Sequence, residues 1–170
     1  MAHRWQGREL VAALSVLIAG CDMTDGAANA AKAPPMAVSA IIDEFLHTRD
    51  SLAMLRNRRA NLDLTFAANG SFTFDLAGVA APGSQLTTGP DGDDLAVVIP
   101  DGIRLTLADV ENRWGKARPI AATAGHAHRF TIDRLASVPG HTGRMVIELT
   151  ARPASLTARV RRLTVMREPG

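Results

Sequence analysis

The fold of this chain is decided by the stretch NLDLTFAANGSFTFDL, residues 61–76. On both sides of its centre, apolar residues alternate with polar or small ones, which is the pattern of a β-strand with one buried face. A three-residue loop over 68–70 sets apolar residues opposite one another, whereas a two-residue loop sets each of them opposite a polar residue. We therefore expect a hairpin with the longer loop. The expected pairs are Phe66 with Phe72 and Leu64 with Phe74.

A second pattern of the same kind surrounds Pro100-Asp101-Gly102. Residues 95–99 and 103–107 both carry an apolar residue at every second position. A three-residue loop between them sets Ile99 opposite Ile103, and proline and glycine suit its first and last positions. We expect a second hairpin here, built like the first.

Three later segments also have a period of two, over 128–132, 145–149 and 156–165. In the last of them the apolar phase changes at the adjacent pair Arg161-Arg162. A phase change within one strand predicts a β-bulge at that point. Short antiparallel strands at this spacing favour a sandwich or a barrel.

Residues 37–60 precede the strands and have the apolar spacing of a helix face. Arg49 falls in the middle of the apolar stripe, so one straight helix is not expected. A break near Thr48, with Asp50 or Ser51 capping a second helix, resolves the conflict. We expect one broken helix or two helices before the sheet.

The closing third of the chain distantly resembles jelly-roll modules of the galactose-binding type. The likeness lies in a loop that ends at Gly125, a strand over 128–132, a Pro139-Gly140 turn and two final strands. It implies a mainly β fold: an antiparallel, jelly-roll-like β-sandwich preceded by an N-terminal helical segment. The alternative is an α+β half-open barrel with a helix.

The N-terminus forms a separate unit that ends at Cys21, the only cysteine of the chain. A basic start is followed by an apolar run over 10–19, which is shorter than the roughly 20 residues that span a bilayer. The run ends in Leu17-Ile18-Ala19-Gly20-Cys21, which resembles the signal peptide and lipobox of bacterial lipoproteins. The resemblance implies cleavage before Cys21 and attachment of diacylglycerol to its sulfur.

This resemblance implies a protein that is lipid-anchored in the bacterial cell envelope and faces the periplasm. Asp22 follows the cysteine, as in lipoproteins that stay in the inner membrane, and so favours the inner over the outer membrane. We expect a signal peptide over 1–20, a flexible tether over 21–36 and one globular domain over 37–170. Within the domain, 37–60 is expected to be helical and 61–170 rich in β-structure.

Charge is unevenly distributed although the net charge is only +2. Residues 91–112 hold six acidic residues against Arg104 alone, whereas residues 113–170 hold eleven basic residues against three acidic ones. The basic segment could face anionic headgroups or acidic glycans, or it could pair with the acidic segment across neighbouring strands. An exported protein makes nucleic acid an unexpected partner.

Few residues suggest chemistry. His126 and His128 lie two apart on a predicted strand and are the candidates to hold a metal, but no further ligand follows at a matching interval, so we expect no metal and no cofactor. Trp114 is the only tryptophan after the leader, and Arg113 and Lys116 flank it. These three residues are the candidate contacts to a ligand or partner.

No catalytic motif is present in the sequence, so we expect a protein that is not an enzyme. The expected function is a binding or scaffolding component of an envelope assembly, with a protein partner in the envelope. The alternative is a small-ligand or carbohydrate-binding module tethered to the membrane.

Overall fold

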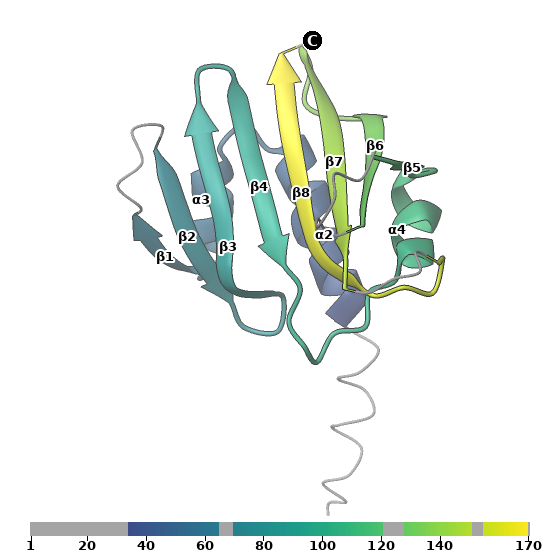
Figure 1. Cartoon of the computed structure of the whole chain (residues 1–170). Helices are drawn as coiled ribbons and strands as arrows, with labels where there is room; N and C mark the ends of the chain where they lie inside the picture. Colours follow the sequence, from purple (N-terminus) through teal and green to yellow (C-terminus); the bar gives the residue numbers. More distant parts are fainter. Residues whose placement is uncertain (1–33, 65–69, 121–127, 151–154, 170) are drawn as a thin grey trace, which may run out of the picture.

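The computed structural model describes residues 34–64, 70–120, 128–150 and 155–169. Its strands form one eight-stranded antiparallel sheet in the order β1-β2-β3-β4-β8-β7-β6-β5, with helices against one face (Figure 1). The strands are β1 (Asn61–Leu64), β2 (Ser71–Leu76), β3 (Ala80–Gly89), β4 (Gly92–Val98), β5 (Arg118–Pro119), β6 (Arg129–Leu135), β7 (His141–Leu149) and β8 (Val160–Pro169).

Two helices precede the sheet, as the sequence predicts. Helix α2 (Pro34–His47) ends just before Thr48, and helix α3 (Ser51–Asn57) follows after a short break. The Asp50 side chain caps α3, because its Oδ1 accepts a hydrogen bond of 2.8 Å from the backbone N–H of Ala53. The predicted break and cap are therefore confirmed.

The core lies between the helices and one face of the sheet. Along β7 the odd-numbered residues from Met145 to Leu149 are buried, and Ile41, Ile42 and Phe45 of α2 belong to the same apolar cluster. The mainly β fold is confirmed, whereas the predicted sandwich is not. Helices, rather than a second sheet, cover the apolar face, and the two edge strands of this single sheet do not pair with each other.

The first hairpin joins the predicted strands in a different register. Leu62 lies opposite Phe74 and Leu64 opposite Phe72, so β1 is shifted by two residues relative to the prediction. A shift of two keeps every apolar side chain on the same face, and alternation alone therefore cannot distinguish the two registers. Phe66 and most of the predicted loop lie outside the described residues.

The second predicted hairpin is wrong. β4 is paired on one side with β3 and on the other with β8, so no edge remains for residues 103–107. The chain instead begins helix α4 (Leu107–Trp114), whose start is a capping box between Thr106 and Asp109. β4 instead forms a hairpin with β3, the preceding strand. The turn at 89–92 joins them, and the alternation of apolar residues did not predict it.

The predicted bulge in the last strand is confirmed. Arg162 pairs with Glu148 and Val160 pairs with Leu149, so Arg161 is the extra residue of β8. The bulge lets β8 keep apolar residues in the core on both sides of the phase change.

The molecule has two distinct ends in Figure 1. The lower end holds the start of α2 and the segment 99–106, and the upper end holds the α2–α3 junction, the β3–β4 turn and the start of β7. In the part of the chain that the structure describes, no helix has the length and apolar character to cross a bilayer.

Candidate functional site

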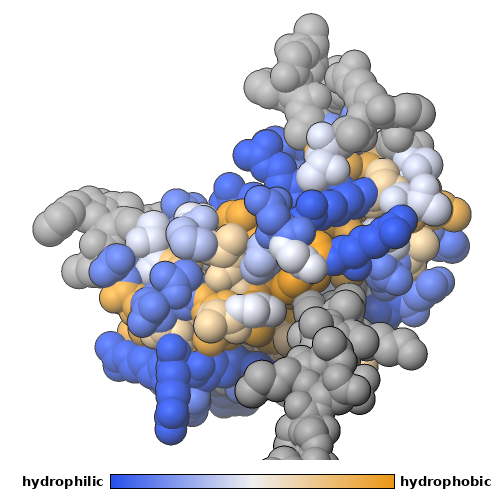
Figure 2. Space-filling view, turned by 90° about the horizontal axis from the view of Figure 1, so that it is seen from below, coloured by the Kyte–Doolittle hydropathy of each residue, from blue (hydrophilic) through white to orange (hydrophobic). Residues whose placement is uncertain are grey.

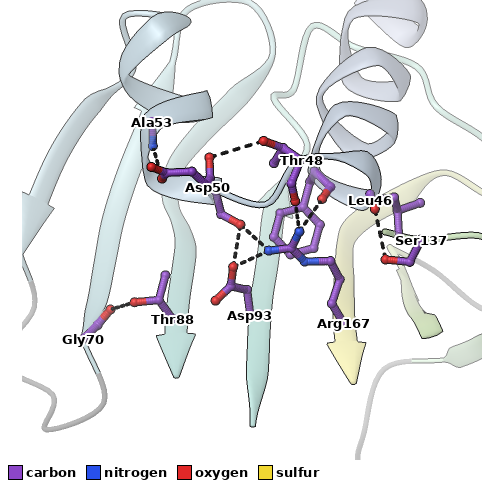
Figure 3. Close-up of polar contacts among 11 residues, drawn as sticks. Leu46, Thr48, Asp50, Ala53, Gly70, Thr88, Asp93, Ser137 and Arg167 are labelled. Atoms are coloured by element: carbon purple, nitrogen blue, oxygen red, sulfur yellow. Dashed lines mark hydrogen bonds and ion pairs between the residues drawn. The ribbon is translucent and has the colours of Figure 1, made fainter. Parts of the chain in front are cut away.

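A buried arginine organises the upper end of the molecule. Arg167, near the end of β8, is 4% exposed and points toward the helices. Its Nη2 donates to the Asp93 carboxylate of β4 and, at 2.6 Å, to the Ser51 hydroxyl at the start of α3. The Ser51 hydroxyl in turn donates to Asp93 at 2.6 Å. We call these three residues the Arg167 cluster (Figure 3).

The Arg167 cluster also holds the end of α2. Nη1 of Arg167 donates to the backbone oxygens of Phe45, at 3.1 Å, and of Thr48 (Figure 3). The last carbonyls of a helix have no partner within the helix, and a cation there is also favoured by the helix dipole. The guanidinium lies 4.5 Å from the centre of the Phe45 ring, in the geometry of a cation–π contact. One side chain thus fixes the α2–α3 junction to two strands.

An open cavity of about 410 Å³ lies beside the Arg167 cluster, and we call it the upper cavity. Four segments form its walls: the α2–α3 junction, the β3–β4 turn, the loop that leads into β7 and the end of β8. The residues that line it are Arg49, Gly89, Pro90, Gly92, Asp93, Val138, Pro139, His141 and Arg167. Gly92 has a φ of +129°, and a Cβ there would collide with the backbone oxygen of Arg167, so only glycine fits this close approach.

The upper cavity has an excess of positive charge. Asp93 is the only carboxylate among its lining residues, and its charge is matched by Arg167. The side chains of Arg49 and His141 are exposed and have no hydrogen-bond or ion-pair partner among the described residues. A further N–H of Arg167, at Nε, is enclosed and also lacks a partner in the described part of the chain. Within the described part of the chain, Arg49 and His141 therefore offer donors to the cavity, and the charge of Arg49 has no counterion.

Two of the three residues predicted to contact a ligand lie together, at the end of α4. The Trp114 indole Nε1 donates to Asp43 of α2 at 2.8 Å, and Arg113 Nε donates to the same carboxylate at 2.9 Å. This hydrogen bond uses the only polar atom of the half-buried Trp114 side chain, and it joins α4 to α2. A smaller cavity of about 230 Å³ lies here, lined by Asp43, Arg113 and Trp114 among others.

Lys116 lies apart from this pair. Its Nζ donates to Glu111 at 2.8 Å. That bond, together with the backbone N–H of Ala117, lowers the pKa of the Glu111 carboxyl. Lys116 instead lines a polar hollow of about 540 Å³ on the β5–β6 side of the sheet. The structure therefore does not bring all three predicted residues to one site.

Basic and acidic groups alternate in this polar hollow. Arg118 and Arg144 both pair with Asp133, and Arg144 also pairs with Glu168. The hydrogen bond from Arg118 lowers the pKa of the Asp133 carboxyl, with smaller contributions from Thr131 and from the nearby positive charges. One pair of the kind expected between the acidic and basic segments lies across neighbouring strands, Arg167 with Asp93, and Arg159 with Asp101 joins the same two segments outside the sheet.

The remaining predicted residues are only partly described. Cys21 and His126 lie outside the described residues. His128 is half-buried just before β6, and its enclosed Nε2 has no partner among the described residues. Within the described ranges, no group of three or more His, Cys, Asp or Glu side chains is placed to hold a metal ion.

Alternation along the strands did carry a signal for the Arg167 cluster that the sequence interpretation missed. Arg167 is in phase with the buried residues Leu163 and Val165, and Asp93 is in phase with Leu95 and Val97. A charged residue at an inward position of a strand requires a partner of opposite charge.

Comparisons with models of protein families, with curated proteins and with solved structures found no match to this chain.

Proposed function

We propose that this chain is a lipid-anchored protein of the bacterial cell envelope whose folded domain is a binding component rather than an enzyme. The observation that carries the proposal is the sequence before Cys21: a basic start, a short apolar run and small residues before a lone cysteine. A single acyl-bearing cysteine also accounts for an unpaired thiol in an oxidising compartment.

The arrangement of the described domain agrees with an anchor of this kind. Helix α2 begins at the lower end, and its 14 residues extend toward the upper end, a length of roughly 20 Å at the rise of an α-helix. A chain attached through Cys21 would join the described domain at the start of α2, which lies at the opposite end of Figure 1 from the β3–β4 turn that lines the upper cavity.

The lower end also exposes apolar surface. Figure 2 views the molecule from this side and shows apolar residues between charged ones. Met36 near the start of α2 is 74% exposed, and Leu156, whose backbone oxygen accepts from Ala108 of α4, is 52% exposed. Apolar side chains at the end nearest to the anchor suit the headgroup region of a bilayer.

Between the two functions expected from the sequence, the upper cavity favours the binding of a small ligand over scaffolding alone. Its volume falls in the range of ligand sites. A carbohydrate site centred on Trp114 is less favoured, because the indole is half-buried, its N–H is held by Asp43 and the Arg113 guanidinium lies 5.8 Å from the ring centre. The proposal also includes a protein partner in the envelope. It places the anchor in the inner membrane, which Asp22 favours.

Metabolic labelling with an alkynyl fatty acid in a bacterial host tests the anchor. We expect the full-length protein to carry the label and to sediment with membranes, and Cys21→Ser to lose both properties. Asp22→Asn is the matched control, since it changes the neighbouring residue and keeps the thiol. A wild-type protein whose mass shows an uncleaved N-terminus or an unmodified cysteine would overturn the proposal.

A further inference from the structure

We propose that the upper cavity binds an oxyanion, the carboxylate or phosphate group of a small ligand, and that Arg49 and His141 contact it. The inference rests on the proposed binding role but not on the lipid anchor. It follows from the charge of the lining residues, from the polar atoms that are free to bind and from the way the cavity wall is fixed.

The charge balance of the cavity favours an anion. Arg49 and Arg167 contribute two positive charges, and Asp93 contributes one negative charge that Arg167 and Ser51 already satisfy. Asp91, in the same turn, does not line the cavity. A ligand oxyanion would supply the missing negative charge in a partly enclosed space, where screening by water is reduced.

The free donors have the chemistry that binds oxyanions. A guanidinium presents two parallel N–H groups that match the two oxygens of a carboxylate or phosphate. The guanidinium of Arg49 is not engaged by any other described side chain or carbonyl, so within those residues its N–H groups are open to a ligand. His141 lines the cavity as well and adds an imidazole N–H.

The position of Arg49 is fixed although its side chain is exposed. The residue follows Thr48, whose backbone oxygen is held by Arg167, and precedes Asp50, which caps α3. Across the cavity, the backbone at Gly92 lies too close to Arg167 for any larger residue, and the adjacent Asp93 pairs with Arg167 between β4 and β8. A binding group on a rigid backbone loses less conformational freedom when a ligand is bound.

This placement also explains a feature of the sequence. Arg49 interrupts the apolar stripe of the helical segment, and the helix break turns it out of the core toward the cavity. Arg56 of α3 is likewise exposed but does not line the cavity. Only the break at the α2–α3 junction brings an arginine to this wall.

An NMR titration of the ¹⁵N-labelled full-length protein in neutral detergent micelles tests the inference. The probes are inorganic phosphate and succinate, with erythritol as an uncharged control, all at low ionic strength. We expect saturable shifts of the Gly89 and Gly92 amides with at least one of the two anions and none with erythritol. The anion that binds more tightly identifies the ligand group as a phosphate or a carboxylate.

Variants separate this site from general attraction to basic residues. Arg49→Gln should weaken the affinity by about tenfold or more, as expected for the loss of a charge-assisted hydrogen bond, and His141→Gln should weaken it less. Arg104→Gln removes an exposed arginine at the lower end and should leave the affinity unchanged. All three positions are exposed, and an unchanged melting temperature would show that the variants are folded.

Two results would overturn the inference: equal affinity of the wild type and Arg49→Gln, or shifts that do not saturate and spread over basic residues throughout the domain. Neither result bears on the anchor, because fatty-acid labelling of Cys21 does not involve the cavity. Failure of the labelling experiment would likewise leave the titration unaffected.

Discussion

Two aspartate–arginine pairs hold helix α2 in place, and they differ in exposure. The side chains of Arg167 and Asp93 are 5% and 17% exposed, whereas those of Arg113 and Asp43 are 49% and 32% exposed. The buried pair joins the α2–α3 junction to the sheet, and the exposed pair joins α4 to the middle of α2. The comparison separates an ion pair on which the fold depends from one of the same chemical type that adds little to stability.

The largest effect is expected from removal of the buried cation. Arg167→Met should lower the free energy of unfolding by about 3–5 kcal/mol, because it leaves Asp93 as an uncompensated charge and the carbonyls at the end of α2 without a donor. Urea unfolding followed by far-UV circular dichroism measures the change. The double variant with Asp93→Asn should recover part of the loss, and a loss below about 1 kcal/mol would contradict this assignment.

A smaller effect is expected at Trp114. Trp114→Phe keeps an aromatic ring at the end of α4 but removes the hydrogen bond to Asp43, which should lower stability by about 1 kcal/mol. The same urea titration measures it, and Trp114→Leu provides a comparison that also removes the ring. A variant as stable as the wild type would show that the indole N–H bond contributes nothing.

Loss of the exposed pair between Arg113 and Asp43 should have a smaller effect on stability than either of these changes. Arg113→Gln should cost less than about 1 kcal/mol, since the pair is largely solvated. The difference from the wild type should shrink as salt is added, whereas the cost of Arg167→Met should not. Melting temperatures at low and high salt measure both, and a salt-independent loss at Arg113 would remove the distinction between the two pairs.

Asp94 is a carboxylate that has no basic partner among the described residues. Burial raises its pKa above 3.8, and the charges of Asp93 and Glu168 raise it further. The folded state therefore binds this proton more tightly than the unfolded state, and the ionised carboxylate opposes folding at neutral pH. Asp94→Asn should stabilise the protein at pH 7, by less than about 1 kcal/mol because the group is partly solvated.

The pH dependence of this gain provides the control. It should be full above the raised pKa, decline as the pH falls toward 3.8 and vanish below that value. Asp133 has the opposite shift, since Arg118 lowers its pKa. Asp133→Asn should therefore destabilise the protein at pH 7, and this loss should disappear as the pH falls through the lowered pKa. Melting temperatures across the pH range would check both signs.

Local patterns predicted the elements better than their pairing. The helix break before Asp50 and the bulge at Arg161 each depend on neighbouring residues, and both are confirmed. The predicted register of β1 and the predicted partner of β4 are wrong, because strand pairing depends on segments that are far apart in the chain. Alternation identifies the buried face of a strand but not the strand that lies beside it.

The candidate site was less predictable than the fold. Residue type alone identifies Trp114 and Arg113 as candidates, and in the structure both side chains donate hydrogen bonds to the Asp43 carboxylate. Arg49 conflicts with the apolar face of a single helix, but only the folded structure places it at the upper cavity, beside the β3–β4 turn. Residues from separate segments form the upper cavity, and no spacing in the sequence relates these segments.

The sequence by itself determined the alternation that makes this domain rich in β-structure, the two helices and the bulge, because these follow from contacts between residues close together in the chain. Tertiary structure alone decided that helices cover the sheet, that β8 lies between β4 and β7, and that Arg167 meets Asp93. Those outcomes depend on which apolar faces and which charges can be buried together, and that choice is made among all segments at once.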